Sequence, residues 1–150
     1  MPGPDTGAQR INGNGPPTRM TLDTAPDRLA IMIDDDAIIL TGMEMMLDSW
    51  GYGVIAADTG AGALAALRAR SPLPTPCVII SDYRLHGLSG VETVRAIRAL
   101  CGASVPAIIL TGDAGADLVA AAQSDGLTVL HKPVAPAELR THIDRLAGQG

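Results

Sequence analysis

The sequence contains no phenylalanine, and aromatic residues make up only 2% of its 150 positions. A hydrophobic core must therefore consist of aliphatic side chains, and few aromatic rings are present on which nucleic acid bases could stack. Lysine occurs once, and the formal net charge is -5 at pH 7. Because nucleic acid binding normally needs a basic surface, this composition predicts no nucleic acid partner and favours cations as small ligands.

Cysteine is also scarce. Cys77 and Cys101 are the two cysteines, and they lack the spacing of metal ligands. We interpret both as buried or half-buried thiols in a reducing compartment. No apolar run reaches the length of a membrane span, and the N-terminus lacks the apolar segment of a secretory signal. These absences predict a cytoplasmic protein with no membrane partner.

The composition changes near residue 28. Residues 1–27 are rich in Pro, Gly, Thr, Asn and Asp and poor in large apolar side chains, which predicts a disordered tail or linker. Residues 28–147 carry the regular hydrophobic patterns and have the length of one domain. We therefore expect a single folded domain over residues 28–147.

Short unbroken apolar runs alternate with helical patterns along this domain. Such runs are typical of strands that are covered on both faces, as in a parallel sheet. Strands are expected at residues 29–33, 54–57, 77–80, 107–110 and 128–130. The alternation predicts a doubly wound α/β fold with a flavodoxin-like five-stranded parallel sheet in the order 2-1-3-4-5.

The intervening helices show apolar stripes that we expect to face the core. The residues of these stripes are Ile39, Met43, Met46, Leu47 and Trp50; Leu64 and Leu67; Val91, Val94, Ile97 and Leu100; Leu118, Val119 and Ala122; and Leu139, Ile143 and Leu146. An alanine-rich stretch at residues 114–122 is expected to offer a packing surface to a protein partner.

Polar residues stand at the carboxyl ends of the expected strands, where ligands bind in open parallel sheets. Asp34, Asp35 and Asp36 follow the first strand, and Asp82 follows the third. Neighbouring carboxylates repel one another unless a cation compensates them. One acid, which we take to be Asp36, is sufficient to cap the next helix. The remaining oxygens suit Mg²⁺, which prefers hard oxygen ligands.

Thr111 and Lys132 complete this set at the ends of the fourth and fifth strands. A lysine ammonium can pair with a carboxylate or a phosphoryl oxygen, and a threonine hydroxyl can donate a hydrogen bond. A carboxylate nucleophile, a divalent cation, an ammonium and a hydroxyl together serve phosphoryl transfer.

The segments IMIDDDAIIL, CVIISDYRLHGLSG, AIILTGD and LHKPV occur in the order found in response regulator receiver domains, and the chain resembles that family over residues 28–146. The resemblance implies that Asp82 is the phosphoacceptor and that Asp35 binds Mg²⁺ directly. It further implies that Asp34 acts beside Asp35, often through water, and that the main-chain carbonyl of Arg84 is a third protein ligand.

In this family, residues such as Thr111 and Lys132 hold the phosphoryl group. The resemblance implies a phosphohistidine donor on a histidine kinase or histidine phosphotransfer protein, and a kinase core or downstream protein as a further partner. It implies no enzyme activity beyond self-catalysed phosphotransfer and dephosphorylation. The segments LDSWGY, SDYRL and VLHKPVAPAELR are most similar to receivers of hybrid histidine kinases.

Several residues depart from the family pattern. His86 stands where the family often has proline, and we interpret it as a solvated loop residue. Val129 replaces the switch aromatic, which puts the aromatic output route in doubt.

His131 is expected to point away from Lys132, and His142 to lie half exposed on the last helix. We also expect no output domain on this chain, because only a few residues follow the fifth helix.

Two other functions remain open at this stage. A protein-interaction module with the receiver fold that accepts no phosphate would explain the missing switch aromatic. A haloacid-dehalogenase-like phosphatase would use Asp34 as nucleophile and Asp36 as acid or base, because the two form an Asp-x-Asp motif after an apolar strand. That family, however, expects further acids after the lysine, and it leaves Asp82 without a role.

Overall fold

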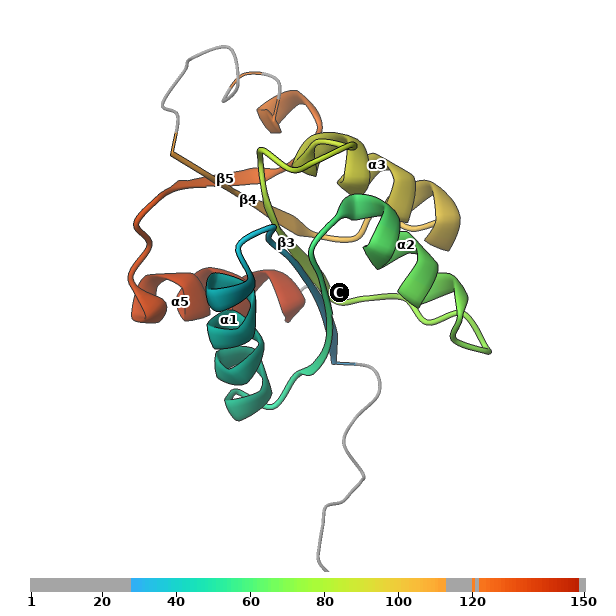
Figure 1. Ribbon diagram of the computed structural model, residues 1–150, viewed down its shortest axis with the longest axis horizontal. Coiled ribbons are helices and arrows are strands. Elements are labelled where there is room, and N and C mark those ends of the chain that lie inside the picture. Colours follow the sequence, from blue (N-terminus) through green and yellow to red (C-terminus); the bar gives the residue numbers. More distant parts are fainter. Residues whose placement is uncertain (1–27, 113–119, 121, 149–150) are drawn as a thin grey trace, which may run out of the picture.

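The computed structural model describes residues 28–112, 120 and 122–148. Its centre is a parallel sheet of five strands, seen nearly edge-on in Figure 1. The strands are β1 (Leu29–Ile33), β2 (Gly53–Ala57), β3 (Val78–Asp82), β4 (Ala107–Thr111) and β5 (Thr128–His131). Their order in the sheet is β2-β1-β3-β4-β5. The predicted flavodoxin-like fold and strand order 2-1-3-4-5 are therefore confirmed.

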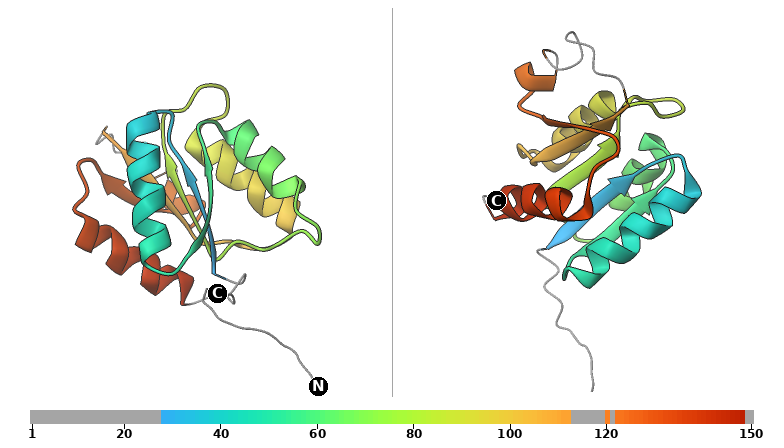
Figure 2. Two further views of the ribbon diagram at one scale, coloured as in Figure 1. Left: turned by 60° about the horizontal axis from the view of Figure 1, so that its bottom comes forward. Right: turned by 90° about the vertical axis from the view of Figure 1, so that its left-hand side faces the viewer.

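Helices cover both faces of the sheet. They are α1 (Ala37–Ser49), α2 (Gly60–Arg68), α3 (Gly90–Cys101) and α5 (Pro136–Ala147). Helices α1 and α5 lie on one face, and α2 and α3 lie on the other, as Figure 2 shows. The three-layer arrangement buries the central strands completely, which explains why β1 and β4 are apolar without alternation.

Two separate hydrophobic clusters fill the spaces between the layers. Alternate residues of β1 enter different clusters: Ile31 and Ile33 pack beneath α2 and α3, whereas Ala30 and Met32 pack beneath α1 and α5. Aliphatic side chains dominate both clusters, as the composition requires. Tyr52 is the one aromatic residue among the buried core residues that the structure describes, with 2% of its surface exposed.

Local signals explain where several helices begin. Asp36 caps α1, because its carboxylate accepts hydrogen bonds from Ile38 N at 3.0 Å and Ile39 N at 3.2 Å. The capping role predicted for Asp36 is therefore confirmed. Ser89 and Glu92 form a reciprocal capping box at the start of α3. These caps fix the two helices that follow β1 and β3, the strands that carry the acids.

The stripe predicted for α1 is partly wrong. Ile39 was expected to face the core, but 41% of its surface is exposed. Ile38 and Met45, on the outer side of the same helix, are 85% and 67% exposed. The reason is that α1 is apolar nearly all round, so the spacing of its apolar residues does not identify the buried side. Leu47 is fully buried, as expected.

The stripes expected on α3 and α5 are confirmed at Val94, Ile97, Leu139 and Ile143, which are all buried. Most of the fourth expected helix, including Leu118 and Val119, lies outside the described residues. Residues 122–124 are helical. Ala122, which we assigned to both the core stripe and the partner surface, is fully buried in the core, so its assignment to the partner surface was wrong.

The domain boundaries, a tail over residues 1–27 and a domain over residues 28–147, stay predictions, because residues 1–27 lie outside the described part.

Candidate phosphoacceptor site

The strands bring the predicted site residues to one edge of the sheet. Asp34 directly follows β1, and Asp82 ends the adjacent strand β3. Thr111 ends β4 and pairs in register with His131 of β5, so Lys132 follows immediately beside it. Because all five strands are parallel, their carboxyl ends lie on the same side of the sheet. Residues separated by up to a hundred positions in sequence thus share one location.

Three carboxylates form a compact group at this edge. Ligand atoms of Asp34, Asp35 and Asp82 all lie within 4.8 Å of one another. Their exposure differs, because side-chain accessibility is 1% for Asp34, 13% for Asp82 and 33% for Asp35. The acids therefore run from the buried floor of the site at Asp34 to its solvent side at Asp35.

Asp34 is the most buried acid of the site. Its Oδ1 accepts a hydrogen bond from Asp36 N at 2.9 Å, whereas its buried Oδ2 accepts none from the residues that the structure describes. Burial raises the pKa of Asp34 above its usual value, and the charges of Asp82 and Asp35 add to this effect, although the Asp36 amide and Lys132 oppose it. A buried carboxylate oxygen without a donor is a position where a water molecule or a cation can bind.

Lys132 is the only lysine of the chain and lies against these acids. Its Nζ is 2.9 Å from Asp82 Oδ1 and 3.8 Å from Asp34 Oδ2, too far in the second case for a hydrogen bond. Burial acts to lower the pKa of Lys132, but the hydrogen bond and attraction to Asp82, with the charges of Asp34 and Asp35, raise it above its usual value. The ammonium is therefore held in its charged form beside the acids.

Thr111 and the loop after β3 flank this group. Thr111 is 2% exposed, and its carbonyl accepts a hydrogen bond from Lys132 N at 2.8 Å, which ties the lysine segment to the end of β4. Arg84 lies in the loop after β3, which is anchored by hydrogen bonds from Tyr83 N to Leu110 O and from Gly90 N to Tyr83 O. The part assigned to the Arg84 carbonyl stays a prediction.

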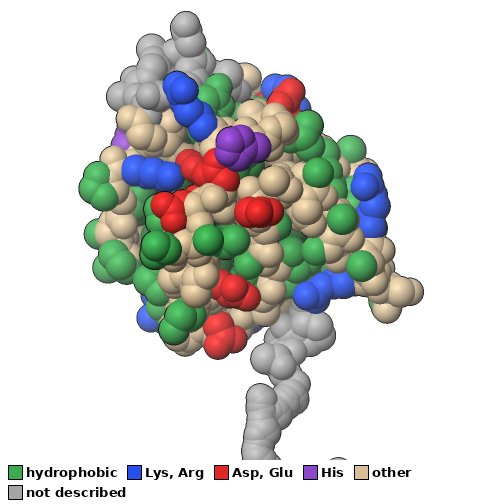
Figure 3. All heavy atoms as spheres, in the orientation of Figure 1, with side chains coloured by type: hydrophobic (Ala, Val, Ile, Leu, Met, Phe, Trp, Pro, Cys, Tyr) green, Lys and Arg blue, Asp and Glu red, His purple; other side chains and the backbone are tan. Residues whose placement is uncertain are grey.

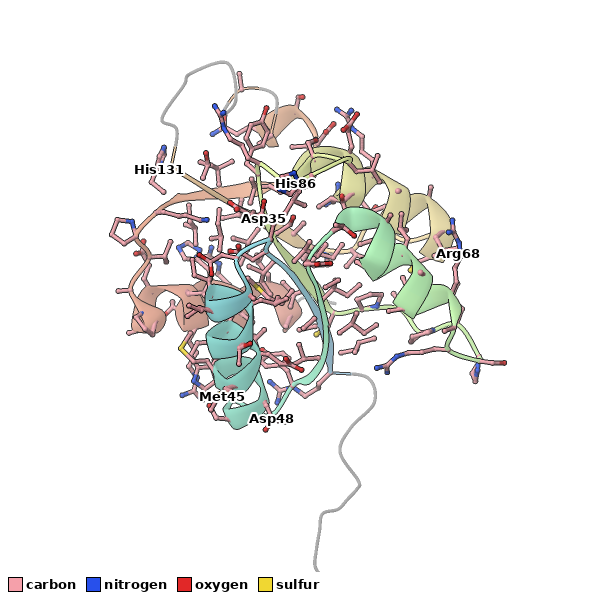
Figure 4. The ribbon with its side chains drawn as sticks, in the orientation of Figure 1. Asp35, Met45, Asp48, Arg68, His86 and His131 are labelled. Carbon is pink, nitrogen blue, oxygen red and sulfur yellow. The ribbon has the colours of Figure 1, made fainter. Side chains whose placement is uncertain are left out.

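The histidines occupy three different environments. His86 has an exposed side chain, as expected, yet its Nε2 lies 3.7 Å from Asp35 Oδ2, a contact that we did not foresee. Figure 4 shows His86 and Asp35 close together and His131 at a distance from both. His142 is half-buried on α5, and its Nδ1 lies 2.9 Å from Arg145 Nη2.

Ser81 also lies in the site region, and the sequence analysis assigned it no role. It is fully buried, and its hydroxyl donates a hydrogen bond to the carbonyl of Asp82 at 2.9 Å. A polar residue at the end of an apolar strand, directly before the candidate phosphoacceptor, was the signal that could have identified it.

The residues present fit a hard divalent cation. Three carboxylates lie near the Lys132 ammonium, and Oδ2 of Asp34, which accepts no hydrogen bond from the described residues, belongs to the same group. Carboxylate oxygens are ligands that favour Mg²⁺ over softer metals. On the face of the molecule drawn in Figure 3, acidic side chains gather next to a basic and a histidine side chain.

A doubly wound five-stranded sheet with acids and a lysine at its carboxyl edge defines the CheY-like class of signalling domains. The comparison with family models identifies the particular family. The model of the response regulator receiver domain matches residues 30–144, and the chain belongs to this family. It is a receiver domain of the kind found in two-component systems, as the segments of the sequence predicted.

Solved structures agree with this assignment. A response regulator receiver domain protein from Clostridium thermocellum has a TM-score of 0.71 and 26% sequence identity, over 81% of this chain and 95% of that one. The chemotaxis protein CheY4 of Vibrio cholerae has a TM-score of 0.70 and 27% identity, over 79% of this chain and 98% of that one.

Curated relatives are longer regulators. The transcriptional regulatory protein FixJ of Bradyrhizobium diazoefficiens is 34% identical over 114 residues, which are 75% of this chain and 53% of the relative. The transcriptional regulatory protein KdpE of Mycobacterium tuberculosis is 38% identical over 100 residues, 59% of this chain and 42% of the relative. The chain thus spans about half of these relatives or less. No helix within the described ranges has the length and apolar character needed to cross a membrane.

Proposed function

We propose that this receiver domain accepts a phosphoryl group on Asp82 from a phosphohistidine of a histidine kinase or histidine phosphotransfer protein. The observation that carries the proposal is the position of the Asp82 carboxylate, which lies 2.9 Å from Lys132 Nζ and within the group of three acids. In the transfer, an Asp82 oxygen attacks the phosphorus, the phosphorus–nitrogen bond of the phosphohistidine breaks, and the imidazole leaves.

The acids Asp34 and Asp35, with Asp82 and the main-chain carbonyl of Arg84, would hold Mg²⁺. The ion would neutralise charge on the phosphoryl oxygens when bound. Support comes from Oδ2 of Asp34, which is buried and accepts no hydrogen bond from the described residues, and from the separation of the acidic oxygens, which is no more than 4.8 Å. Lys132 would pair with a phosphoryl oxygen as a fixed positive charge, and the hydroxyl of Thr111 would donate to another.

Phosphorylation adds about two negative charges at Asp82 and would change the surface that a protein partner reads. We assign the output to a protein partner, either a kinase core or a downstream protein. Val129 is half-buried against the core at the position where a switch aromatic is common, so the change would not depend on an aromatic ring. This replacement also favours the second candidate, an interaction module that accepts no phosphate.

The phosphatase reading is weakened by Asp36. Its Oδ1 accepts hydrogen bonds from two backbone amides at the start of α1, which gives Asp36 the role of a helix cap. We therefore propose no catalytic turnover beyond transfer to Asp82 and hydrolysis of the resulting aspartyl phosphate.

The test is the mass of the intact protein after incubation with acetyl phosphate and Mg²⁺. We expect one added phosphoryl group on the wild-type protein, none without Mg²⁺ and none on Asp82→Asn. The matched control is Asp48→Asn, because Asp48 is an exposed acid at the far end of α1 from Asp35, as Figure 4 shows. This variant should be labelled like the wild type.

Other outcomes would redirect the assignment. A wild-type protein labelled neither by acetyl phosphate nor by phosphoramidate would support the interaction module. Label that persists on Asp82→Asn would shift the nucleophile to Asp34 and revive the phosphatase.

A further inference from the structure

The peptide unit that follows the candidate phosphoacceptor is held at both of its polar ends. Its carbonyl, from Asp82, accepts the hydrogen bond of the Ser81 hydroxyl at 2.9 Å. Its amide, from Tyr83, donates to Leu110 O at 2.8 Å. Because a peptide unit is planar, two hydrogen bonds at opposite ends define the orientation of the whole plane.

Gly90, the first residue of α3, lies against the same Asp82 carbonyl. A Cβ atom built on Gly90 would overlap the carbonyl oxygen of Asp82 and lie 3.1 Å from Ser81 Oγ. Gly90 N also donates to Tyr83 O at 2.9 Å, which holds the next peptide unit of the loop. The backbone on the carboxyl side of Asp82 is therefore restrained over two successive peptide units. The Ser81 hydroxyl restrains the first of these units through its hydrogen bond to the Asp82 carbonyl.

This restraint determines where the Asp82 carboxylate points. The plane of this peptide unit contains the Cα atom of Asp82, so holding the plane at both ends also holds the atom from which the side chain starts. The carboxylate must lie 2.9 Å from Lys132 Nζ and near the oxygens of Asp34 and Asp35. A displacement of the plane would shift the Cα atom, and with it the carboxylate, relative to all of these groups.

We propose that Ser81 is a positioning residue for the phosphoacceptor, whose hydroxyl holds the Asp82–Tyr83 peptide so that the carboxylate is aimed at Lys132. The proposal rests on the proposed phosphorylation of Asp82 and adds a residue that the acid, threonine and lysine motifs do not contain. A purely structural hydroxyl would only satisfy its own hydrogen bond inside the core, and its loss would lower stability alone.

The chain contains a matched structural control. Thr93 is also fully buried, and its Oγ1 donates to Ser89 O at 2.8 Å, within the first turn of α3. This hydroxyl bonds a carbonyl oxygen as Ser81 does, but that carbonyl belongs to Ser89 rather than to Asp82. Thr93→Val removes the hydroxyl and keeps the shape of the side chain.

The experiment compares Ser81→Thr with Ser81→Val, which have the same shape and differ only in the hydroxyl. Phosphorylation by acetyl phosphate is followed at saturating Mg²⁺, and thermal unfolding is measured in parallel. We expect Ser81→Val to lower the maximal rate about tenfold relative to Ser81→Thr, because misplacement of a reacting group costs rate. The acetyl phosphate concentration for half-maximal rate should not change, since the donor site itself is intact.

Thr93→Val should lose stability and keep the wild-type maximal rate. A wild-type protein that accepts no phosphoryl group would refute the proposed function and this inference together. A phosphorylated wild type with equal maximal rates in Ser81→Thr and Ser81→Val would overturn the positioning role alone and leave the proposed function intact.

Discussion

The two ends of the sheet use charged side chains in opposite ways. At the carboxyl end, Asp34, Asp35 and Asp82 share a single ammonium, and one buried oxygen of Asp34 accepts no hydrogen bond within the described part of the chain. At the amino end, the guanidinium of Arg28 lies 4.5 Å from the centre of the Tyr52 ring. The Tyr52 hydroxyl in turn donates to Asp144 Oδ1 at 2.8 Å.

The amino-end network continues along α5 to Arg140. Arg140 Nε lies 3.5 Å from the other carboxylate oxygen of Asp144, and the Arg140 guanidinium stands 5.4 Å from the centre of the Trp50 ring. Two of the three aromatic residues of the chain thus join the turn after α1 to α5. The network thus links elements far apart in sequence.

The charged groups at the amino end differ in their expected role from those at the carboxyl end. At the amino end, opposite charges and a hydrogen-bonded hydroxyl contact one another at the surface of the protein. Like charges at the carboxyl end repel one another unless a cation compensates them, and such an arrangement is typical of functional sites. The comparison therefore predicts that changes at the amino end affect stability, whereas changes at the carboxyl end affect metal binding.

The largest effect is expected from Tyr52→Ala. Tyr52 is buried, packs in the core beneath α1 and α5, and joins Arg28 to Asp144. Its truncation should lower the free energy of unfolding by about 3–5 kcal/mol, because it leaves a large cavity and removes a hydrogen bond. Urea denaturation monitored by circular dichroism measures this loss.

The same variant tests whether the amino end and the carboxyl end of the sheet act independently. Where Tyr52→Ala remains folded, its dissociation constant for Mg²⁺ should equal that of the wild type, as measured by calorimetry at low temperature. A weaker Mg²⁺ affinity in the folded variant would show that the ends are coupled and would contradict the comparison.

A smaller change in the free energy of unfolding, an increase rather than a decrease, is expected from Asp34→Asn. Without divalent cations, the substitution removes an undercompensated buried charge and should raise the free energy of unfolding by about 1 kcal/mol. The wild type should gain about 1.4 kcal/mol when Mg²⁺ is present at about ten times its dissociation constant, and the variant should gain far less. Denaturation curves with Mg²⁺ and with a chelator measure both effects.

Asp48→Asn is the control for this prediction, because Asp48 is exposed on α1 and lies outside the group of acids. It should keep the full Mg²⁺-dependent gain. An Asp34→Asn variant that is destabilised in the chelator would show that the carboxylate is compensated by groups other than a metal ion.

The sequence predicted most of the fold because its signals are local. The apolar runs that form β1 and β4 are short and unbroken, and each ends in polar residues at the carboxyl edge, so both the strands and the site followed from them. The difference in burial between Asp34 and Asp35 could not be predicted, since it depends on where the chain turns from β1 into α1. The Tyr52–Asp144 hydrogen bond joins residues 92 positions apart and leaves no pattern in the sequence.

The smallest expected effect is a pH dependence of the stability that Tyr52 contributes at the amino end of the sheet. Burial raises the pKa of the Tyr52 hydroxyl above its usual value of about 10, and the hydrogen bond to Asp144 adds to this shift, although Arg28 opposes it. Above that pH the unfolded chain releases the tyrosine proton more readily than the folded protein, so proton release favours unfolding. The stability contributed by Tyr52 is therefore fully present below pH 10 and is lost as the pH rises through the pKa of the folded state.

Tyr52→Phe removes this ionisation and keeps the ring against Arg28. Near pH 8 the variant should be less stable than the wild type by about 1 kcal/mol, the usual contribution of one hydrogen bond. Near pH 11, about one unit above the usual tyrosine pKa, the difference should shrink, because only the wild type loses stability through Tyr52. All other titrating groups are common to both proteins, so their effects cancel in the difference. A difference in unfolding free energy that stays constant between these two conditions would mean that the hydroxyl ionises as easily in the folded protein as in the unfolded chain.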